Sequence, residues 1–251
     1  RPERLGLQSA DGVQLNLDAL YQIAPSCFTE AADPKTGKIK RMVNFDTLRQ
    51  LLGDDAVEDA PEAYEFNWVG KQAARAEVLE PIKKTLRPVK EDSVDWDNTQ
   101  NLYIEGDNLD VLKCLKETYL HKVKIIYIDP PYNTGKDFIY GDNFAEDADK
   151  YLFNSDQYDE QGNRLSTNME TNGRFHTDWL NMIYPRLKVA RDFLKEDGVI
   201  FISIDDHEVD NLRKICDEIF GVTNFTGCIV LQTATDNNPR QINTEHECIL
   251  C

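Results

Sequence analysis

No apolar run in the 251-residue sequence approaches the length of a membrane-spanning helix, and its first residues show no signal-peptide pattern. The six cysteines have no framework spacing, and a chain of this size does not need disulfides to fold. Free thiols in a reducing cytosol are therefore expected. These absences predict a cytoplasmic protein that makes no contact with a membrane.

Positive charge is also scarce. The chain has 28 Lys and Arg residues against 45 Asp and Glu residues, which gives a formal net charge of −17. A protein that binds nucleic acid over a broad surface needs basic residues to release counterions. We therefore expect any nucleic-acid contact to be confined to a small site, or to use basic residues outside this stretch.

The most informative stretch is an apolar, β-branched run, residues 123–128, which ends abruptly in Asp129-Pro130-Pro131-Tyr132. The run is typical of a buried strand in a parallel sheet. Two prolines cannot continue a sheet ladder, so the strand must stop at Asp129 and the chain must turn. The carboxyl ends of such strands are where open α/β sheets bind their ligands.

The rest of the chain from residue 91 alternates between strand and helix patterns and contains one long polar and aromatic excursion, residues 133–175. This order predicts an α/β fold with a doubly wound, mainly parallel sheet. Residues 1–90 are expected to form a mostly helical N-terminal appendage, with helices over 41–52 and 71–80. The expected strands are 102–104, 123–128, 199–204, 225–232 and 246–251, and the expected helices between them are 107–119, 176–194 and 209–219.

The four residues after the central strand offer a specific chemistry. The Asp129 carboxylate and the Pro130 carbonyl are two acceptors held close together, which suits an amino group with two N–H bonds to donate. Tyr132 offers a flat face for a nucleobase, and proline rigidity keeps the arrangement preorganised. Accepting both amine hydrogens frees the nitrogen lone pair for attack on an electrophile. The alternative is that the two prolines only end a strand.

The motifs resemble the modification subunits of type III restriction–modification systems, which are amino-methylating DNA methyltransferases dependent on S-adenosylmethionine. In that class an Asp first in the tetrapeptide is typical of adenine N6, and Ser is common for cytosine N4. The resemblance covers roughly residues 85–235 and adds a Rossmann-like methyltransferase fold to the expectation. It is carried by residues 102–109 (LYIEGDNL), 129–136 (DPPYNTGK), 173–182 (GRFHTDWLNM) and 197–206 (DGVIFISIDD).

The resemblance implies S-adenosylmethionine as cofactor and double-stranded DNA as substrate, with the target adenine flipped into a pocket. It implies catalytic roles for Asp129, Pro130, Pro131 and Tyr132. The same four residues and Asp107 are implied to contact the cofactor. The family organisation further implies a homodimer and an ATP-dependent restriction subunit as partner, in a prokaryotic cytoplasm.

The sequence contains no Gly-x-Gly triplet, and its 13 glycines are scattered singly. In the class that it resembles, the glycine-containing cofactor half and the target-recognition region follow the catalytic half. We therefore expect residues 91–251 to be the catalytic half of an incomplete methyltransferase domain. Cytosine-N4 methylation, RNA adenine methylation, and an inert fragment that acts as a protein-interaction platform remain alternatives.

Three weaker patterns have structural explanations that we favour. His176-x-Asp178 could belong to an iron site, but a helix start explains it. His246-x-Cys248-x-x-Cys251, with Cys228, has the spacing of a zinc half-site, but core packing on a strand explains it. The acidic residues 205–208 could be catalytic, but Asp205 or Asp206 is expected to cap the next helix. No metal site is expected.

Overall fold

The computed structural model describes residues 11–32, 39–53, 65–135, 138–140, 165–167, 174–232 and 246–251. The chain groups into two compact units, one formed by Ala10–Glu65 and the other containing Phe66–Cys251. The domain boundary predicted from the sequence follows residue 90, whereas the boundary between these two units falls between residues 65 and 66. The roles assigned to the two segments stay predictions.

A four-stranded sheet forms the centre of the larger unit, and its strand order is β3-β6-β8-β7. The strands β3 and β6 run parallel, with Tyr127 opposite Phe201. In contrast, β8 runs antiparallel to both β6 and β7. The strands are β3 (Val123–Ile128), β6 (Leu194–Ile204), β7 (Cys228–Gln232) and β8 (His246–Leu250).

The α/β class is thus confirmed, but the sheet is mixed where the sequence analysis expected a mainly parallel one. The physical reason is the connection between β7 and β8. A parallel neighbour requires a crossover back to the starting edge, usually through a helix, whereas an antiparallel neighbour does not. The buried, apolar character of the strands predicts their existence but not the direction of the last pair.

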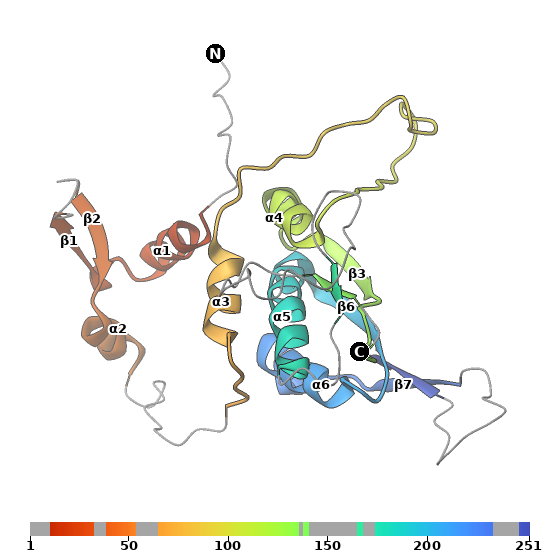
Figure 1. Cartoon of the computed structure of the whole chain (residues 1–251). Coiled ribbons are helices and arrows are strands. Elements are labelled where there is room, and N and C mark those ends of the chain that lie inside the picture. The colour runs from red at the N-terminus through yellow and green to blue at the C-terminus, as the bar shows by residue number, and fades with distance from the viewer. Residues whose placement is uncertain are drawn as a thin grey trace. The chain divides into compact units, whose positions relative to one another are not determined.

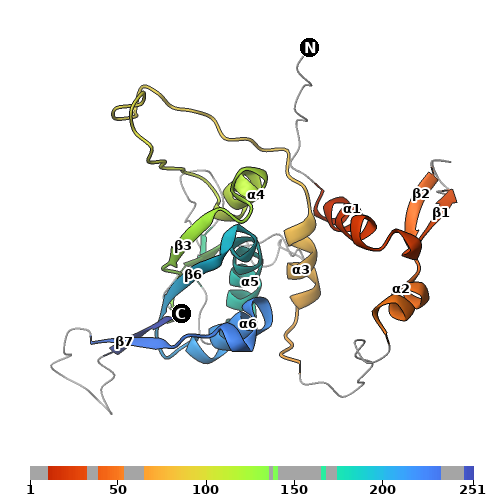
Figure 2. The same cartoon turned by 180° about the vertical axis from the view of Figure 1, so that it is seen from behind.

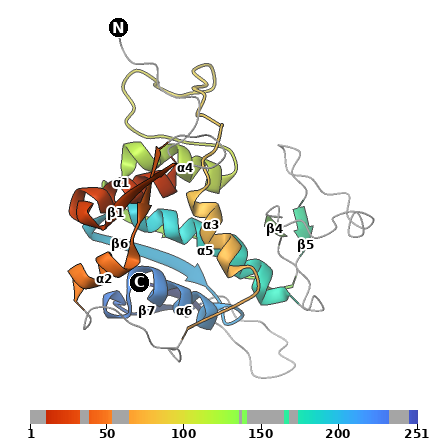
Figure 3. The same cartoon turned by 90° about the vertical axis from the view of Figure 1, so that its left-hand side faces the viewer.

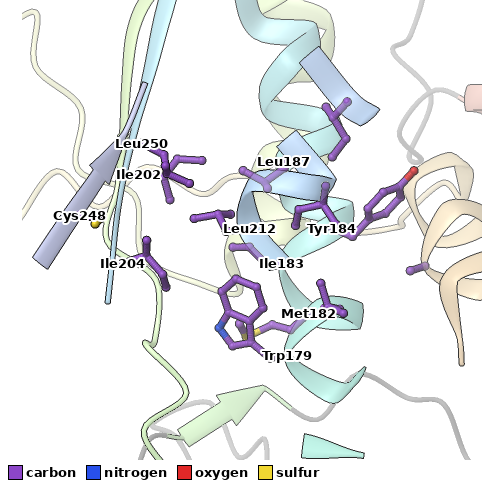
Figure 4. Packing of buried hydrophobic residues seen from close by; sticks show 14 residues of the cluster. Trp179, Met182, Ile183, Tyr184, Leu187, Ile202, Ile204, Leu212, Cys248 and Leu250 are labelled. Carbon is purple, nitrogen blue, oxygen red and sulfur yellow. The ribbon is translucent and has the colours of Figure 1, made fainter. Parts of the chain in front are cut away.

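Helices cover one face of this sheet. The helices α5 and α6 lie on the same side of β6 (Figures 1 and 2), and α5 is buried along most of its length. Its side chains meet those of β6, β8 and α6 in one core, where Trp179, Ile183 and Leu187 face Ile202 and Ile204 (Figure 4). The helices are α3 (Lys71–Leu79), α4 (Asn108–Tyr119), α5 (Phe175–Phe193), α6 (Val209–Phe220) and the short 3₁₀ helix η4 (Val222–Asn224).

The predicted strand 102–104 is wrong. Residues 101–105 have no strand assignment, and Leu102 and Tyr103 are 70% and 91% exposed. Within the described residues, the sheet partner of β3 is β6 alone, so the segment has no ladder to join. A triplet of apolar residues needs such a neighbour to become a strand, because its hydrogen bonds must be made to another chain segment.

The excursion 133–175 lies largely outside the described residues. Within it, β4 (Phe138–Tyr140) pairs antiparallel with β5 (Leu165–Thr167). Figure 3 shows this small ribbon set apart from the four-stranded sheet. The aromatic residues Phe144 and Tyr151 of this excursion lie outside the described residues.

The smaller unit combines two helices with a hairpin, so it is less helical than expected. Each helix begins at a capping side chain: Asp11 accepts from the Val13 amide, and Asn44 accepts from the Thr47 amide. Because Asn44 starts the second helix, residues 41–43 of the predicted helix belong to a strand. The elements are α1 (Gly12–Ile23), η1 (Pro25–Cys27), β1 (Phe28–Ala32), β2 (Ile39–Val43) and α2 (Phe45–Leu52).

Candidate active site

The Asp129-Pro130-Pro131-Tyr132 corner follows the carboxyl end of β3, where the sequence analysis placed it. The Asp129 side chain is exposed, Pro130 is buried, and Pro131 and Tyr132 are half-buried. Neither proline can donate a backbone hydrogen bond, so the corner cannot extend the β3 ladder. The structure therefore presents one carboxylate to solvent on a backbone of restricted freedom.

Trp179 of α5 holds the corner through a hydrogen bond to its backbone. Its indole Nε1 donates a hydrogen bond to the Pro131 carbonyl oxygen over 2.7 Å, and the side chain has no exposed surface. A buried indole N–H requires an acceptor, and the Pro131 carbonyl oxygen provides it. The Pro131 carbonyl is thus engaged by the protein itself, and the sequence analysis assigned the accepting role to the Pro130 carbonyl.

Asn133 anchors the other end of the corner. It is fully buried and adopts a left-handed backbone conformation with φ of 60°, which asparagine tolerates better than most residues. Its Nδ2 donates to Glu208 Oε1 over 2.5 Å and to the Phe175 carbonyl over 3.3 Å. The sequence analysis missed both Asn133 and Glu208 as parts of the site.

The expected capping by Asp205 or Asp206 is also wrong, since the residue at the start of α6 is Glu208. Asp205 instead accepts from the His207 amide within the preceding turn. A Glu immediately before a run of helical periodicity was the available signal for Glu208. Its partners Asn133 and His176 belong to other segments, so that signal alone indicates a helix start rather than a buried carboxylate.

Tyr132 is held through its hydroxyl. Its ring packs against the core beneath the sheet, and its hydroxyl donates to Glu247 Oε2 over 3.3 Å. Removal from water, followed by the negative charges of Asp129 and Glu247, raises the pKa of the Tyr132 hydroxyl above its usual range. The hydroxyl therefore remains a neutral donor at neutral pH.

A cavity of about 950 Å³ adjoins the corner. It lies between β3, α4, α5 and the segment 102–104, and its walls are mainly apolar. Its volume is that of a small-molecule binding site. The lining includes Asp129, Pro130 and Pro131 from the corner, the apolar residues Leu102, Ile104, Val111, Leu112, Leu115, Tyr119, Val123, Ile126, Ile128, Met182, Ile183, Ala190 and Phe193, and the polar residues Asn108, Tyr127 and Arg186.

Asp107 and Tyr132 are not among these lining residues. Asp107 caps α4 by accepting from the Asp110 amide over 3.0 Å, and its second oxygen lies 3.6 Å from the buried guanidinium of Arg186. The Arg186 Nε also donates to Asn108 Oδ1. The structure thus brings three of the four corner residues to the cavity wall. Asp107 does not reach this wall, but it precedes the lining residue Asn108 in the chain and lies near the lining residue Arg186.

A slightly larger cavity, of about 1040 Å³, lies at the start of β6. Its lining comes from residues 194–202 and from α5, α6 and the segments that follow α6. None of the corner residues contributes to it. Of these two cavities, only the one of about 950 Å³ is lined by residues of the candidate chemistry.

The weaker patterns of the sequence have local partners. His176 Nδ1 lies 2.7 Å from Glu208 Oε1, and His246 Nε2 lies 3.6 Å from Asp206 Oδ1. Cys248 is buried at the edge of the core. In the described ranges, no group of three or more His, Cys, Asp or Glu side chains is arranged to hold a metal ion. Likewise, none of the helices described is long and apolar enough to span a bilayer.

Comparison with known proteins gives a consistent set of relatives. Residues 123–251 match the DNA methylase family of N6 and N4 methyltransferases. The chain is 43% identical over 208 residues to the type III restriction-modification enzyme EcoP15I Mod subunit of Escherichia coli, which covers 81% of this chain and 32% of the relative. It is 34% identical over 242 residues to the StyLTI Mod subunit of Salmonella typhimurium, covering 93% and 37%.

A further relative is the type II methyltransferase M.KpnI of Klebsiella pneumoniae, 36% identical over 156 residues, covering 61% of this chain and 32% of the relative. The chain thus spans about a third of the length of the curated relatives it matches. The matches to Mod subunits confirm the resemblance inferred from the motifs. The matched range 123–251 includes the whole corner and every residue that anchors it.

Proposed function

Since this chain belongs to the DNA methylase family, we propose that it carries the catalytic corner of a DNA methyltransferase that modifies the N6 amino group of adenine. The observation that supports this most directly is the exposed Asp129 carboxylate at the wall of the cavity, on a proline corner held by Trp179 and Asn133. A preorganised acceptor of this kind contributes to catalysis only when a substrate brings a hydrogen-bond donor to it.

The proposed work of the corner is to change the geometry of the amine. The lone pair of an exocyclic amine is delocalised into the base, so the nitrogen is a poor nucleophile. Asp129 and the Pro130 carbonyl would accept hydrogen bonds from its two N–H groups, which pulls the nitrogen toward tetrahedral geometry. Methylation then makes a proton on nitrogen acidic, and Asp129 is placed to receive it. The Tyr132 ring would support the face of the base.

The residues around the cavity fit S-adenosylmethionine as the bound cofactor. Apolar walls from Leu112, Val111 and Ile126 suit an adenine ring, and the volume of about 950 Å³ is sufficient for a ligand of that size. Asn108 and Arg186 offer polar groups at one side, and the Asp129 carboxylate suits a cationic sulfonium at the other. When bound, this cofactor supplies an activated methyl group. We propose Asp107 as a further, indirect contributor through the α4 N-terminus.

The proposal extends to the assembly that the family resemblance implies. We propose that the full-length protein acts on double-stranded DNA with the adenine flipped out of the stack, because N6 cannot be reached inside a duplex. A homodimer, association with an ATP-dependent restriction subunit, and a Rossmann-like arrangement of the complete domain are part of the same proposal. A prokaryotic cytoplasm is its expected location. The acidic charge of −17 requires that DNA be held at restricted places.

The test is transfer of labelled methyl groups from S-adenosylmethionine to duplex DNA by the full-length protein. We expect Asp129→Ala to lower the rate by at least about 1000-fold, because it removes one of two acceptors at the reacting nitrogen. Binding of S-adenosylmethionine, measured by calorimetry, should persist in this variant if only the transfer step is lost. Unchanged transfer by Asp129→Ala would overturn the assignment.

Cytosine-N4 methylation is the second candidate, since the matched family contains both activities and the corner grips any exocyclic amine in the same way. The methylated nucleoside decides between them. Digestion of the modified DNA should release N6-methyl-2′-deoxyadenosine, and N4-methyl-2′-deoxycytidine would favour the second candidate instead.

A further inference from the structure

Glu208 is a buried carboxylate that the proposed reaction does not use. It stands at the start of α6 with no exposed surface. Three side-chain donors converge on it: Asn133 Nδ2 and His176 Nδ1 on Oε1, and Asn211 Nδ2 on Oε2 over 2.8 Å. A carboxylate offers only acceptors, so three donors match its requirements. The group is therefore fully engaged, and it joins three separate segments.

This arrangement is unusual for a residue at a helix start. Such residues commonly accept hydrogen bonds from backbone amides of their own first turn, and Glu208 makes no such side-chain cap. Burying a carboxylate costs several kcal/mol unless partners compensate. A cap could be provided by a short, exposed side chain without this cost. The placement of Glu208 is thus better explained by what it holds than by the helix it begins.

What it holds is the exit from the corner. Asn133 directly follows Tyr132, and its φ of 60° sets the direction in which the chain leaves. The two prolines fix their own φ angles, so the orientation of Tyr132 depends mainly on the backbone conformation at Asn133. The second hydrogen bond of Asn133, to the Phe175 carbonyl, connects this residue to the start of α5. Loss of the Glu208 contact would remove the 2.5 Å hydrogen bond that holds Asn133 to α6.

We propose that Glu208 is a positioning residue for methyl transfer: through Asn133 it fixes the corner so that Asp129 and Tyr132 meet the amine in the productive geometry. The proposal rests on the proposed function of the corner. Glu208 itself does not touch the substrate. Misplacement of reacting groups by about 1 Å costs on the order of 100-fold in rate, so a positioning residue is visible mainly in kcat.

The structure supplies a matched control. Asn211 donates to the other carboxylate oxygen from within α6, and this hydrogen bond does not involve the corner. The variant Asn211→Ala therefore removes one of the three donors while leaving the Asn133 contact in place. If the role of Glu208 is merely structural, loss of either contact should lower kcat to a similar extent. If Glu208 positions the corner, kcat should fall only when the contact with Asn133 is lost.

The experiment measures kcat and the KM for S-adenosylmethionine in the full-length protein on duplex DNA. We expect Glu208→Ala, which removes the acceptor of Asn133, to lower kcat by on the order of 100-fold with KM changed by less than about threefold. Asn211→Ala should keep a kcat near that of the wild type. Glu208→Gln keeps an amide oxygen that can accept from Asn133, so it should retain a substantial part of kcat.

Each outcome is decisive. A Glu208→Ala protein with wild-type kcat, or an equal loss in Asn211→Ala, overturns the proposal. If Glu208→Ala does not fold, as judged by its circular dichroism melt, the Glu208→Gln variant decides. Its folding and turnover support the proposal, and folding without turnover overturns it. A wild-type protein that transfers no methyl group to DNA would instead refute the proposed function itself, so the two failures are distinguishable.

Discussion

The two faces of the four-stranded sheet differ sharply, although the same strands form both. On the helix-covered face, Ile202 and Ile204 are buried against α5 and α6. On the opposite face, Ile125 and Tyr127 are 61% and 60% exposed. The apolar run 123–128 has hydrophobic residues on both faces, so the pattern alone predicts burial of both. The difference shows that the described chain builds one complete layer of core.

The sharpest test of this comparison is a pair of matched truncations. Ile202→Ala should lower the free energy of unfolding by about 4 kcal/mol, because it leaves a cavity in a close-packed core. Ile125→Ala should lower it by less than about 1 kcal/mol, since little of its surface is removed from water. Denaturant unfolding of both variants gives the two values. Equal losses would mean that the outer face of β3 is also covered.

A second prediction concerns the ion pairs between α3 and α6. Lys71 and Arg75 of α3 each form an ion pair with Glu218 of α6 over 2.8 Å, and Tyr184 donates to the same carboxylate. Burial alone raises the pKa of Glu218, but the hydrogen bonds from Lys71, Arg75 and Tyr184 outweigh it, so the net pKa is lowered. Glu218→Gln should cost about 3 kcal/mol at pH 7, because it leaves the nearly buried Lys71 without this carboxylate.

The pH dependence gives the control for that variant. A carboxyl group with a lowered folded pKa contributes stability that is present above its unfolded pKa of about 4.5 and is lost as the pH falls through the folded value. The difference between the wild type and Glu218→Gln should therefore shrink between pH 5 and pH 3 in denaturant titrations. A difference that stays constant over this range would exclude a charged role for Glu218.

The chemistry of the corner could be predicted from the sequence because it is local. A carboxylate and two prolines after an apolar run indicate a strand end with acceptors, whatever lies around them. The anchors could not be predicted, since Trp179 contacts Pro131 across 48 positions and Glu208 contacts Asn133 across 75. In the sequence, Trp179 fits a helical repeat and Glu208 fits a helix start. Their second roles depend on the packing of α5 and α6 against the corner.

The strands show the same limit. The presence and order of the helices and strands from residue 107 onward follow from periodicity and end signals, such as Gly221, whose φ of 93° ends α6. The boundary between α5 and β6 does not, because β6 begins at Leu194 rather than at the expected residue 199. The direction of β8 and the fate of residues 102–104 depend on which segments become neighbours. Neither is written in the local pattern, because hydrogen bonding between strands is decided by the assembled sheet.

The anchor on the helix-covered side provides the third prediction. Trp179→Phe keeps most of the apolar volume but removes the indole donor, which leaves the Pro131 carbonyl without this partner. We expect a loss of about 2 kcal/mol in the free energy of unfolding, the cost of a buried acceptor that is left unsatisfied. Calorimetric or denaturant unfolding measures it. A loss below 0.5 kcal/mol would indicate that water replaces the indole, and would remove Trp179 from the list of anchors.

The smallest expected effect concerns Tyr132, which reaches toward Glu247 of β8. Tyr132→Phe keeps the ring and removes one partly buried hydroxyl, so it should cost only about 0.5 kcal/mol of stability. The raised pKa of Tyr132 fixes the sign of its pH dependence. The folded hydroxyl stays neutral where the unfolded one ionises, so its contribution is complete below about pH 10 and is lost above it. The phenylalanine variant should therefore lose less stability than the wild type between pH 9 and pH 11. Identical alkaline curves for the two proteins would mean that the hydroxyl does not feel Asp129 and Glu247, and that the ring is held by packing alone.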